Sequence, residues 1–202
     1  PIDLESIDIN EIRKKFNLPV DKRIFVYGGN LGIPQGVDFL IELISIYRNP
    51  KIYFLIIGSG TEFDKIQNWF HLNKPNNASL LSALPKNEYD QLVSACDLGL
   101  IFLNKKFTIP NFPSRLLNYL EFGLPVISIT DENTDIGDYI EKYQCGSKLI
   151  SGDLNNVILK LDEYSGFGQN EWEVLGKNAL ELLVNEFLVQ RSYGLINYKI
   201  NV

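Results

Sequence analysis

The sequence has very few of the residues that most often build metal sites and nucleophilic triads. Its 202 residues include one histidine, two cysteines and no methionine. Because Ser-His-Asp and Cys-His triads each need a histidine, His71 would have to serve in any of them, and no GxSxG turn accompanies it. His71 follows Trp69 and Phe70 at a predicted helix end, which favours a structural role. Without paired His or Cys residues or a DxD cluster, we expect neither a metal nor a cofactor.

Long apolar runs and basic runs are also missing. The longest apolar segments, such as 98–103 and 124–129, are far shorter than the ~20 residues of a membrane-spanning helix. The formal net charge is −6 without any cluster of Lys and Arg, which argues against a nucleic-acid partner. Cys96 and Cys145 form neither a CxxC pair nor a disulfide framework, which favours reduced thiols and a cytoplasmic location. Association with the inner face of a membrane is expected only through another domain.

The lack of methionine also means that the sequence contains no translation start, so we expect it to be part of a longer protein. With 45% hydrophobic and 22% charged residues, it is otherwise typical of one globular domain with a sizeable core. We assign residues 1–22 to a linker and the start of the domain, 23–190 to the domain itself, and 191–202 to a C-terminal helix.

Short apolar runs alternate with amphipathic stretches along the chain, which is typical of successive strand–helix units. Between the first two runs, Val37, Leu40, Ile41 and Ile44 recur at helical spacing. The pattern predicts an α/β fold, a Rossmann-like three-layer α/β/α arrangement with a parallel sheet of about six strands. The predicted strands are 24–28, 52–57, 78–82, 98–103, 125–129 and 147–150, and the predicted helices after the first are 62–70, 87–95, 114–122, 135–142, 154–164 and 171–187.

Sheets of this kind bind ligands beyond the carboxyl ends of their strands, so the strand–helix turns are the candidate site. The first turn, 27–36, is rich in glycine, which lets the backbone approach an anionic ligand at a helix start. It lacks the GK[ST] ending of a P-loop and the glycine spacing of the dinucleotide-binding fingerprint. The alternative to ligand binding is a mobile glycine loop. The second turn, with Gly58 and Gly60, is equally consistent with a tight turn in which Thr61 caps the next helix.

The third turn lies within 109–127 and leads into a helix that begins near Ser114. We expect the N–H groups of Arg115 and Leu116 to be unpaired there and to face an anion such as pyrophosphate. Arg115 is expected to be exposed and to be the cation nearest that anion. A surface ion pair with a carboxylate such as Glu121 is the alternative interpretation.

Four segments together resemble the retaining glycosyltransferases of family four. Residues 113–127 resemble the PSK-LxEY-xAxG-xPVI signature, and residues 29–37 resemble the GNxGxxQG variant of bacterial members that build surface polysaccharides. Residues 54–60 match the family's third landmark, and residues 94–100 match its AxxADxxL segment. The four follow in the expected order and spacing over roughly residues 20 to 190.

The resemblance implies one half of a GT-B fold, the half that binds a nucleoside-diphosphate sugar, partnered by an N-terminal acceptor-binding domain that the sequence lacks. It implies a hexosyltransferase of bacterial polysaccharide or glycoconjugate biosynthesis that works without metal and retains the anomeric configuration. We expect the fragment alone to be inactive. The implied substrate-binding residues are Gly29, Asn30, Gln35, Gly58, Gly60, Leu84, Pro85, Ser114, Arg115, Leu116 and Asn118. By analogy, Asn118 contacts the ribose, Leu84 and Pro85 flank the base, and the other turns hold the diphosphate.

The sequence departs from the family's pattern at positions where the family usually has charged side chains. In the first turn, Asn30 and Gln35 stand where the family usually has Arg and Lys. The candidate for stabilising the leaving diphosphate is therefore Arg115, with Lys105 or Lys106 as alternatives.

The paired-glutamate motif is altered as well, because Pro110 and Asn118 occupy its two positions. An asparagine makes a weaker ribose contact than a carboxylate. Two alternatives stay open: a nucleotide-sugar 2-epimerase, which shares the fold but generally has more acidic and histidine residues in its cleft, and a nucleotide-sugar-binding module that has lost catalysis.

Overall fold

The structure is a computed structural model that describes residues 8–106 and 112–188. Its strands are β1 (Arg23–Asn30), β2 (Ile52–Ser59), β3 (Ala78–Ser82), β4 (Leu98–Phe102), β5 (Val126–Thr130) and β6 (Gly146–Ile150). They form one parallel sheet in the order β3-β2-β1-β4-β5-β6, which confirms the predicted sheet. The chain starts in the middle, runs outward to β3 and returns to β4. The strand order therefore reverses between β1 and β4, which is where such sheets bind ligands.

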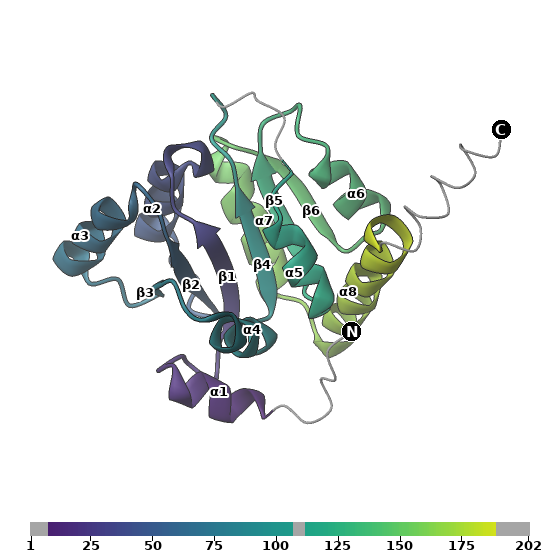
Figure 1. Cartoon of the computed structure of the whole chain (residues 1–202), viewed down its shortest axis with the longest axis horizontal. Helices are drawn as coiled ribbons and strands as arrows, with labels where there is room; N and C mark the ends of the chain where they lie inside the picture. Colours follow the sequence, from purple (N-terminus) through teal and green to yellow (C-terminus); the bar gives the residue numbers. More distant parts are fainter. Residues whose placement is uncertain (1–7, 107–111, 189–202) are drawn as a thin grey trace.

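Helices cover both faces of the sheet, which confirms the three-layer α/β/α prediction. Figure 1 shows α4 (Lys86–Ser94) and α5 (Arg115–Glu121) in front of the sheet, with α2 (Val37–Ile46) and α7 (Leu154–Ser165) behind it. Among the described residues, none of the helices is both long and apolar enough to cross a membrane. The helix expected at 191–202 lies outside the described residues. The other helices of the described residues are α1 (Ile9–Lys15), α3 (Phe63–Asn73), α6 (Ile136–Lys142) and α8 (Gln169–Leu182), with a 3-10 turn at Ile33–Gln35 and a π turn at Leu183–Phe187.

Each face of the sheet carries its own hydrophobic core. Successive side chains of a strand point to opposite faces, so Phe25 and Tyr27 of β1 pack with α2 and α7, while Ile24 and Val26 pack with α4 and α5. All four are buried. A parallel strand covered on both faces needs apolar residues at nearly every position, which is why these strands are visible in the sequence as continuous apolar runs.

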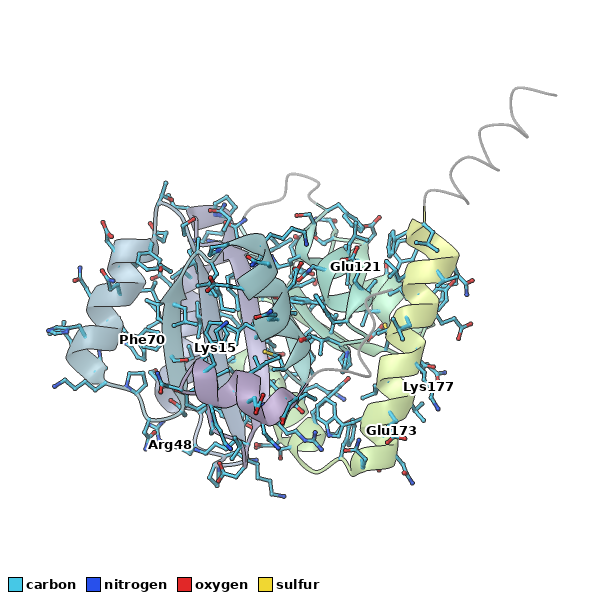
Figure 2. All side chains as sticks on the ribbon, turned by 60° about the horizontal axis from the view of Figure 1, so that its bottom comes forward. Lys15, Arg48, Phe70, Glu121, Glu173 and Lys177 are labelled. Carbon is cyan, nitrogen blue, oxygen red and sulfur yellow. The ribbon has the colours of Figure 1, made fainter. Side chains whose placement is uncertain are left out.

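Residues 8–22, which lie in the segment expected to form a linker and the start of the domain, pack onto the rest of the domain. Arg13 of α1 is only 7% exposed. Its Nε donates to the carbonyl of Ala95 at 2.9 Å, and its Nη2 forms an ion pair with Asp97 at 2.7 Å. Figure 2, in which this end of the molecule comes forward, shows α1 with Lys15 lying across it. A lone Arg on a short polar helix gives no sign in the sequence that a buried carboxylate faces it.

Tyr119 of α5 fills the gap at the point where β1 and β4 part. The two strands pair through only two residues each. The Tyr119 hydroxyl accepts a hydrogen bond from the Gly28 N–H at 2.8 Å and donates to the carbonyl of Val26 at 3.2 Å. A side chain at Gly99 would overlap the Tyr119 ring. The phenol thus satisfies backbone groups that lack a partner strand, and the opening at the switch point is preserved.

We expect Tyr119→Phe to lower the free energy of unfolding by about 1–3 kcal/mol, because it leaves the buried Gly28 N–H without its acceptor. Urea denaturation followed by circular dichroism measures the change. Tyr53→Phe is the matched control, since this half-buried phenol on β2 has no hydrogen bond within the described ranges. Its effect should stay within about 0.5 kcal/mol. Equal midpoints for the two variants would contradict the assigned role of Tyr119.

Candidate functional site

A cavity of about 580 Å³ lies at the carboxyl ends of the central strands. Its walls come from the ends of β1 and β2, the segment after β3, and the facing ends of α4 and α5. Cavities of this size hold ligands as large as a nucleotide. The lining residues are Gly28, Gly29, Asn30, Gln35, Ile57, Gly58, Ser59, Ala83, Leu84, Lys86, Tyr89, Asp90, Leu103, Phe112, Pro113, Ser114, Arg115 and Asn118.

Bare backbone forms the part of the wall between β1 and β2. Gly29 has φ +121, a conformation that side chains rarely allow. Gly58 lies beside it in register, and a Cβ there would overlap the Gly29 carbonyl oxygen. The two glycines therefore let the strands stay close and leave their backbone accessible to a ligand.

Asn30 and Gln35 bind each other across the first turn. The Asn30 Nδ2 donates to the Gln35 Oε1 at 3.2 Å, and the Gly32 N–H donates to the same oxygen at 3.2 Å. Gln35 is only 7% exposed. Its side chain is thus used mainly to close the turn, and Asn30 presents a neutral amide to the cavity.

Arg115 is the central charged group of the cavity. Its guanidinium stacks over the Tyr27 ring at 4.4 Å and lies against Gly29. The Nη1 atom is buried and has no hydrogen-bond partner among the described residues. Arg115 as a whole is half-buried rather than exposed. It forms no ion pair with Glu121, which is exposed at the far end of α5 (Figure 2).

The protonation states around Arg115 favour a fixed positive charge. Burial acts to lower the pKa of its guanidinium, but Tyr27, Tyr119 and Tyr89 outweigh this effect and raise the pKa. Burial raises the pKa of Tyr89 to about 12, although Arg115 acts to lower it. Arg115 is thus cationic and its tyrosine neighbours neutral at physiological pH. Buried polar groups normally have hydrogen-bond partners, so the free Nη1 indicates an anionic ligand.

The start of α5 differs from the expectation in one respect. The Leu116 N–H is not free, because it donates to the carbonyl of Pro113 at 2.9 Å in a tight turn. The Leu116 side chain is fully buried in the core. Ser114 makes no capping hydrogen bond with its side chain and is exposed at the cavity. Pro110, at the first position of the altered glutamate motif, lies outside the described residues.

The wall that α4 contributes was missed from the sequence. Asp90 accepts a hydrogen bond from Asn118 Nδ2 at 3.3 Å and pairs with Lys86 Nζ at 2.5 Å. Tyr89 packs its hydroxyl over Gly28. Only their position in the first turns of the helix that follows β3 could have indicated them, because which face of α4 meets α5 depends on the tertiary packing.

Residues 8–164 match the sequence profile of the family described as "Glycosyl transferases group 1". The chain belongs to this family. The matched segment contains every residue of the cavity wall.

Curated relatives are similar over part of their length. WcaI of Escherichia coli (strain K12), a "putative colanic acid biosynthesis glycosyl transferase", is 25% identical over 139 residues, which cover 67% of this chain and 33% of WcaI. The "probable glycosyltransferase" WbjE of Pseudomonas aeruginosa is 24% identical over 173 residues, which cover 86% of this chain and 43% of WbjE. The chain thus spans a third to somewhat under half of these relatives.

The fold of this glycosyltransferase domain is also found in solved structures. The crystal structure of Anabaena HepE in complex with UDP superposes with a TM-score of 0.71 at 18% identity, covering 96% of this chain and 52% of that chain. The chain therefore has the Rossmann-like fold of one half of a GT-B glycosyltransferase, as its sequence predicts.

Some residues chosen from the family resemblance do not line the cavity. Gly60, Pro85 and Leu116 are absent from its wall, as are Lys105 and Lys106. A Cβ at Gly60 would lie 2.5 Å from a backbone oxygen that follows β1, so this glycine serves loop packing. Arg115 is therefore the cation that the described residues place beside the glycine turn.

The histidine and the two cysteines of the chain lie apart from the cavity. His71 is exposed on α3, and Cys96 and Cys145 are buried with free thiols. In the described ranges, His, Cys, Asp and Glu do not gather in any group of three that could hold a metal ion.

Proposed function

We propose that this chain is the donor-binding half of a glycosyltransferase that moves a sugar from a nucleoside-diphosphate sugar to an acceptor in bacterial surface-polysaccharide or glycoconjugate biosynthesis. The observation that carries the proposal is the buried Nη1 atom of Arg115, which has no hydrogen-bond partner among the described residues and lies at the switch point of a group 1 glycosyltransferase domain. The names of WcaI and WbjE and the UDP bound in HepE support it.

The diphosphate is assigned to the end of the cavity where Arg115, Gly29 and Ser114 meet. An unpaired cation in a partly enclosed cavity binds an anion more strongly than it would in water. The backbone at Gly29 admits the phosphates without side-chain obstruction. The nucleoside then extends along α5 past Asn118 toward the apolar Leu84, both of which line the same cavity.

The chemistry of this half is electrostatic. When the bond between the sugar and the diphosphate breaks, negative charge grows on the leaving phosphate, and Arg115 lies where it can stabilise that charge. Asn30 and Ser114 add neutral donors at the same end of the cavity. Stabilisation by fixed donors needs no divalent ion, so metal-independent transfer is part of the proposal. Retention of configuration is included because the sequence resembles the retaining glycosyltransferases of family four.

The acceptor is assigned to a second domain, since the chain spans less than half of WcaI and WbjE. The isolated chain should therefore bind the donor without transferring the sugar. The free thiols of Cys96 and Cys145 support a reducing, cytoplasmic location.

Calorimetric titration of the 202-residue chain with UDP, GDP, ADP and the corresponding nucleosides tests the proposal. At least one diphosphate should bind roughly tenfold or more tightly than its nucleoside, as expected for a charge-assisted contact. EDTA should leave the affinity unchanged. Failure of every nucleotide to bind contradicts donor binding, and loss of binding in EDTA that Mg²⁺ or Mn²⁺ restores contradicts metal independence.

A further inference from the structure

The π turn that follows α8 reaches the cavity wall through an aromatic contact. The turn comprises Leu183–Phe187. Its Phe187 ring packs against the Phe112 ring with 5.3 Å between the centroids, and Phe112 lines the cavity. Figure 1 shows α8 beside α5 and α6 on this flank of the sheet. A segment distant in sequence thus lies against the wall of the candidate site.

The π turn is itself fixed to α6. The Glu186 Oε1 accepts hydrogen bonds from Lys142 Nζ at 2.9 Å and from the Tyr143 hydroxyl at 2.8 Å. Only 10% of the Glu186 side chain is exposed. The Phe187 ring also packs against Tyr139 with 5.7 Å between the centroids. Hydrogen bonds to an ionised group are roughly twice as strong as neutral ones, so the turn is a fixed support for what rests on it.

Phe112 connects this support to the end of the cavity that carries Arg115. Phe112 is 42% exposed, so packing in the core fixes its position only in part. It precedes Ser114 by two residues and Arg115 by three. The Pro113 carbonyl between them accepts a hydrogen bond from the Leu116 N–H in the tight turn that begins α5. A displacement of Phe112 would therefore change the geometry of that turn.

We propose that Phe187 is a positioning residue of the donor site, which acts through Phe112 to hold the diphosphate end of the cavity in its binding geometry. This inference rests on the proposed donor binding. Phe187 is not part of the cavity wall, so its influence on a ligand passes through Phe112. A wall that keeps its binding geometry only part of the time lowers the apparent affinity by that fraction. Turns of the π type are rare and occur frequently at functional sites, which agrees with this role.

Calorimetric titration with a nucleoside diphosphate and its nucleoside tests the inference. The probe is whichever of UDP, GDP and ADP the wild-type chain binds most tightly. Phe187→Ala and Phe112→Ala should each weaken diphosphate binding by about threefold to tenfold, the size of effect that one aromatic pair supports. Nucleoside affinity should change by less than about twofold, because the contact supports the end assigned to the phosphates. The double variant should bind no more weakly than Phe112→Ala alone, since both substitutions remove the same contact.

Two further variants separate positioning from a general loss of stability. Val184→Ala is the matched control, because it shortens an exposed side chain on the same π turn. It should leave diphosphate affinity unchanged. Phe187→Leu keeps most of the apolar volume and disturbs the fold less, so its loss of affinity should be only about twofold to threefold. Thermal denaturation followed by circular dichroism establishes that each chain is folded at the titration temperature.

The outcomes distinguish this inference from the proposed function. Wild-type diphosphate affinity in folded Phe187→Ala, or in Phe187→Leu if the alanine chain does not fold, overturns the inference and leaves donor binding intact. Losses that multiply in the double variant do the same, because they show that the two rings act independently. Equal losses for diphosphate and nucleoside also overturn it and assign Phe187 to stability alone. Failure of the wild-type chain to bind any of the three diphosphates removes the proposed function together with the inference.

Discussion

Replacing Arg115 with alanine is expected to weaken UDP binding by roughly tenfold or more, the equivalent of about 1.5–3 kcal/mol for a charge-assisted contact. Uridine should bind almost as before, because Arg115 is assigned to the phosphates. The physical reason is that the Arg115 guanidinium lies close to the Gly29 backbone and that its buried Nη1 has no hydrogen-bond partner among the described residues. Calorimetric titration with UDP and with uridine measures both affinities.

Two further variants separate the role of Arg115 from a general effect of charge. Arg48→Ala removes the same charge from an exposed site (Figure 2) and should leave UDP affinity unchanged. Arg115→Lys keeps the charge but loses the planar group that stacks on Tyr27, so partial loss of affinity is expected. Equal UDP affinities for the wild type and Arg115→Ala would remove Arg115 from the site.

The effect of Arg115→Ala on stability should be small for a reason that the sequence does not reveal. Stacking of the guanidinium on Tyr27 stabilises the fold. Holding a buried charge without a partner carboxylate destabilises it. Because the two effects oppose each other, the variant should change binding much more than the melting temperature.

The sheet could be predicted from the sequence because its strands are buried on both faces. Phe25 and Val26 face opposite cores, so β1 is apolar throughout. The glycine turn was predicted less well. Gly29 and Asn30, which indicate a turn in the sequence, continue β1 and pair with Gly58 and Ser59. Gly29 and Gly58 thus allow the two strands to pair closely beside the cavity, in addition to allowing the chain to turn.

The environment of the site's side chains could not be predicted in the same way. Arg115 follows a helix start, and its position alone suggests exposure, whereas its burial depends on Tyr27 and Tyr89 from two other elements. Asp90 and Asn118 are 28 residues apart and meet only because α4 and α5 pack against the same core. Periodicity identifies the elements, but the contacts between their polar faces depend on tertiary packing.

Gly58→Ala is expected to damage both the fold and the site, because β1 and β2 come together at this glycine. Gly58 pairs in register with Gly29, and an added Cβ would overlap the Gly29 carbonyl oxygen. Backbone cannot move aside as a flexible side chain can, so the strands must separate or the local pairing must break. Overpacking of this kind costs about 1–3 kcal/mol or more in the free energy of unfolding. Since Gly29 also lies against Arg115, UDP affinity should fall together with stability.

Urea denaturation and UDP titration of Gly58→Ala measure the two effects, and Gly166→Ala provides the control. Gly166 ends α7 with φ −88, and the nearest atom to an added Cβ is a backbone oxygen at 3.3 Å. This control should change the free energy of unfolding by no more than about 0.5 kcal/mol and leave UDP binding unchanged. A Gly58→Ala chain with wild-type stability and affinity would contradict the close approach of β1 and β2. Wild-type affinity in a destabilised but still folded chain would instead place the diphosphate away from the Gly29 backbone.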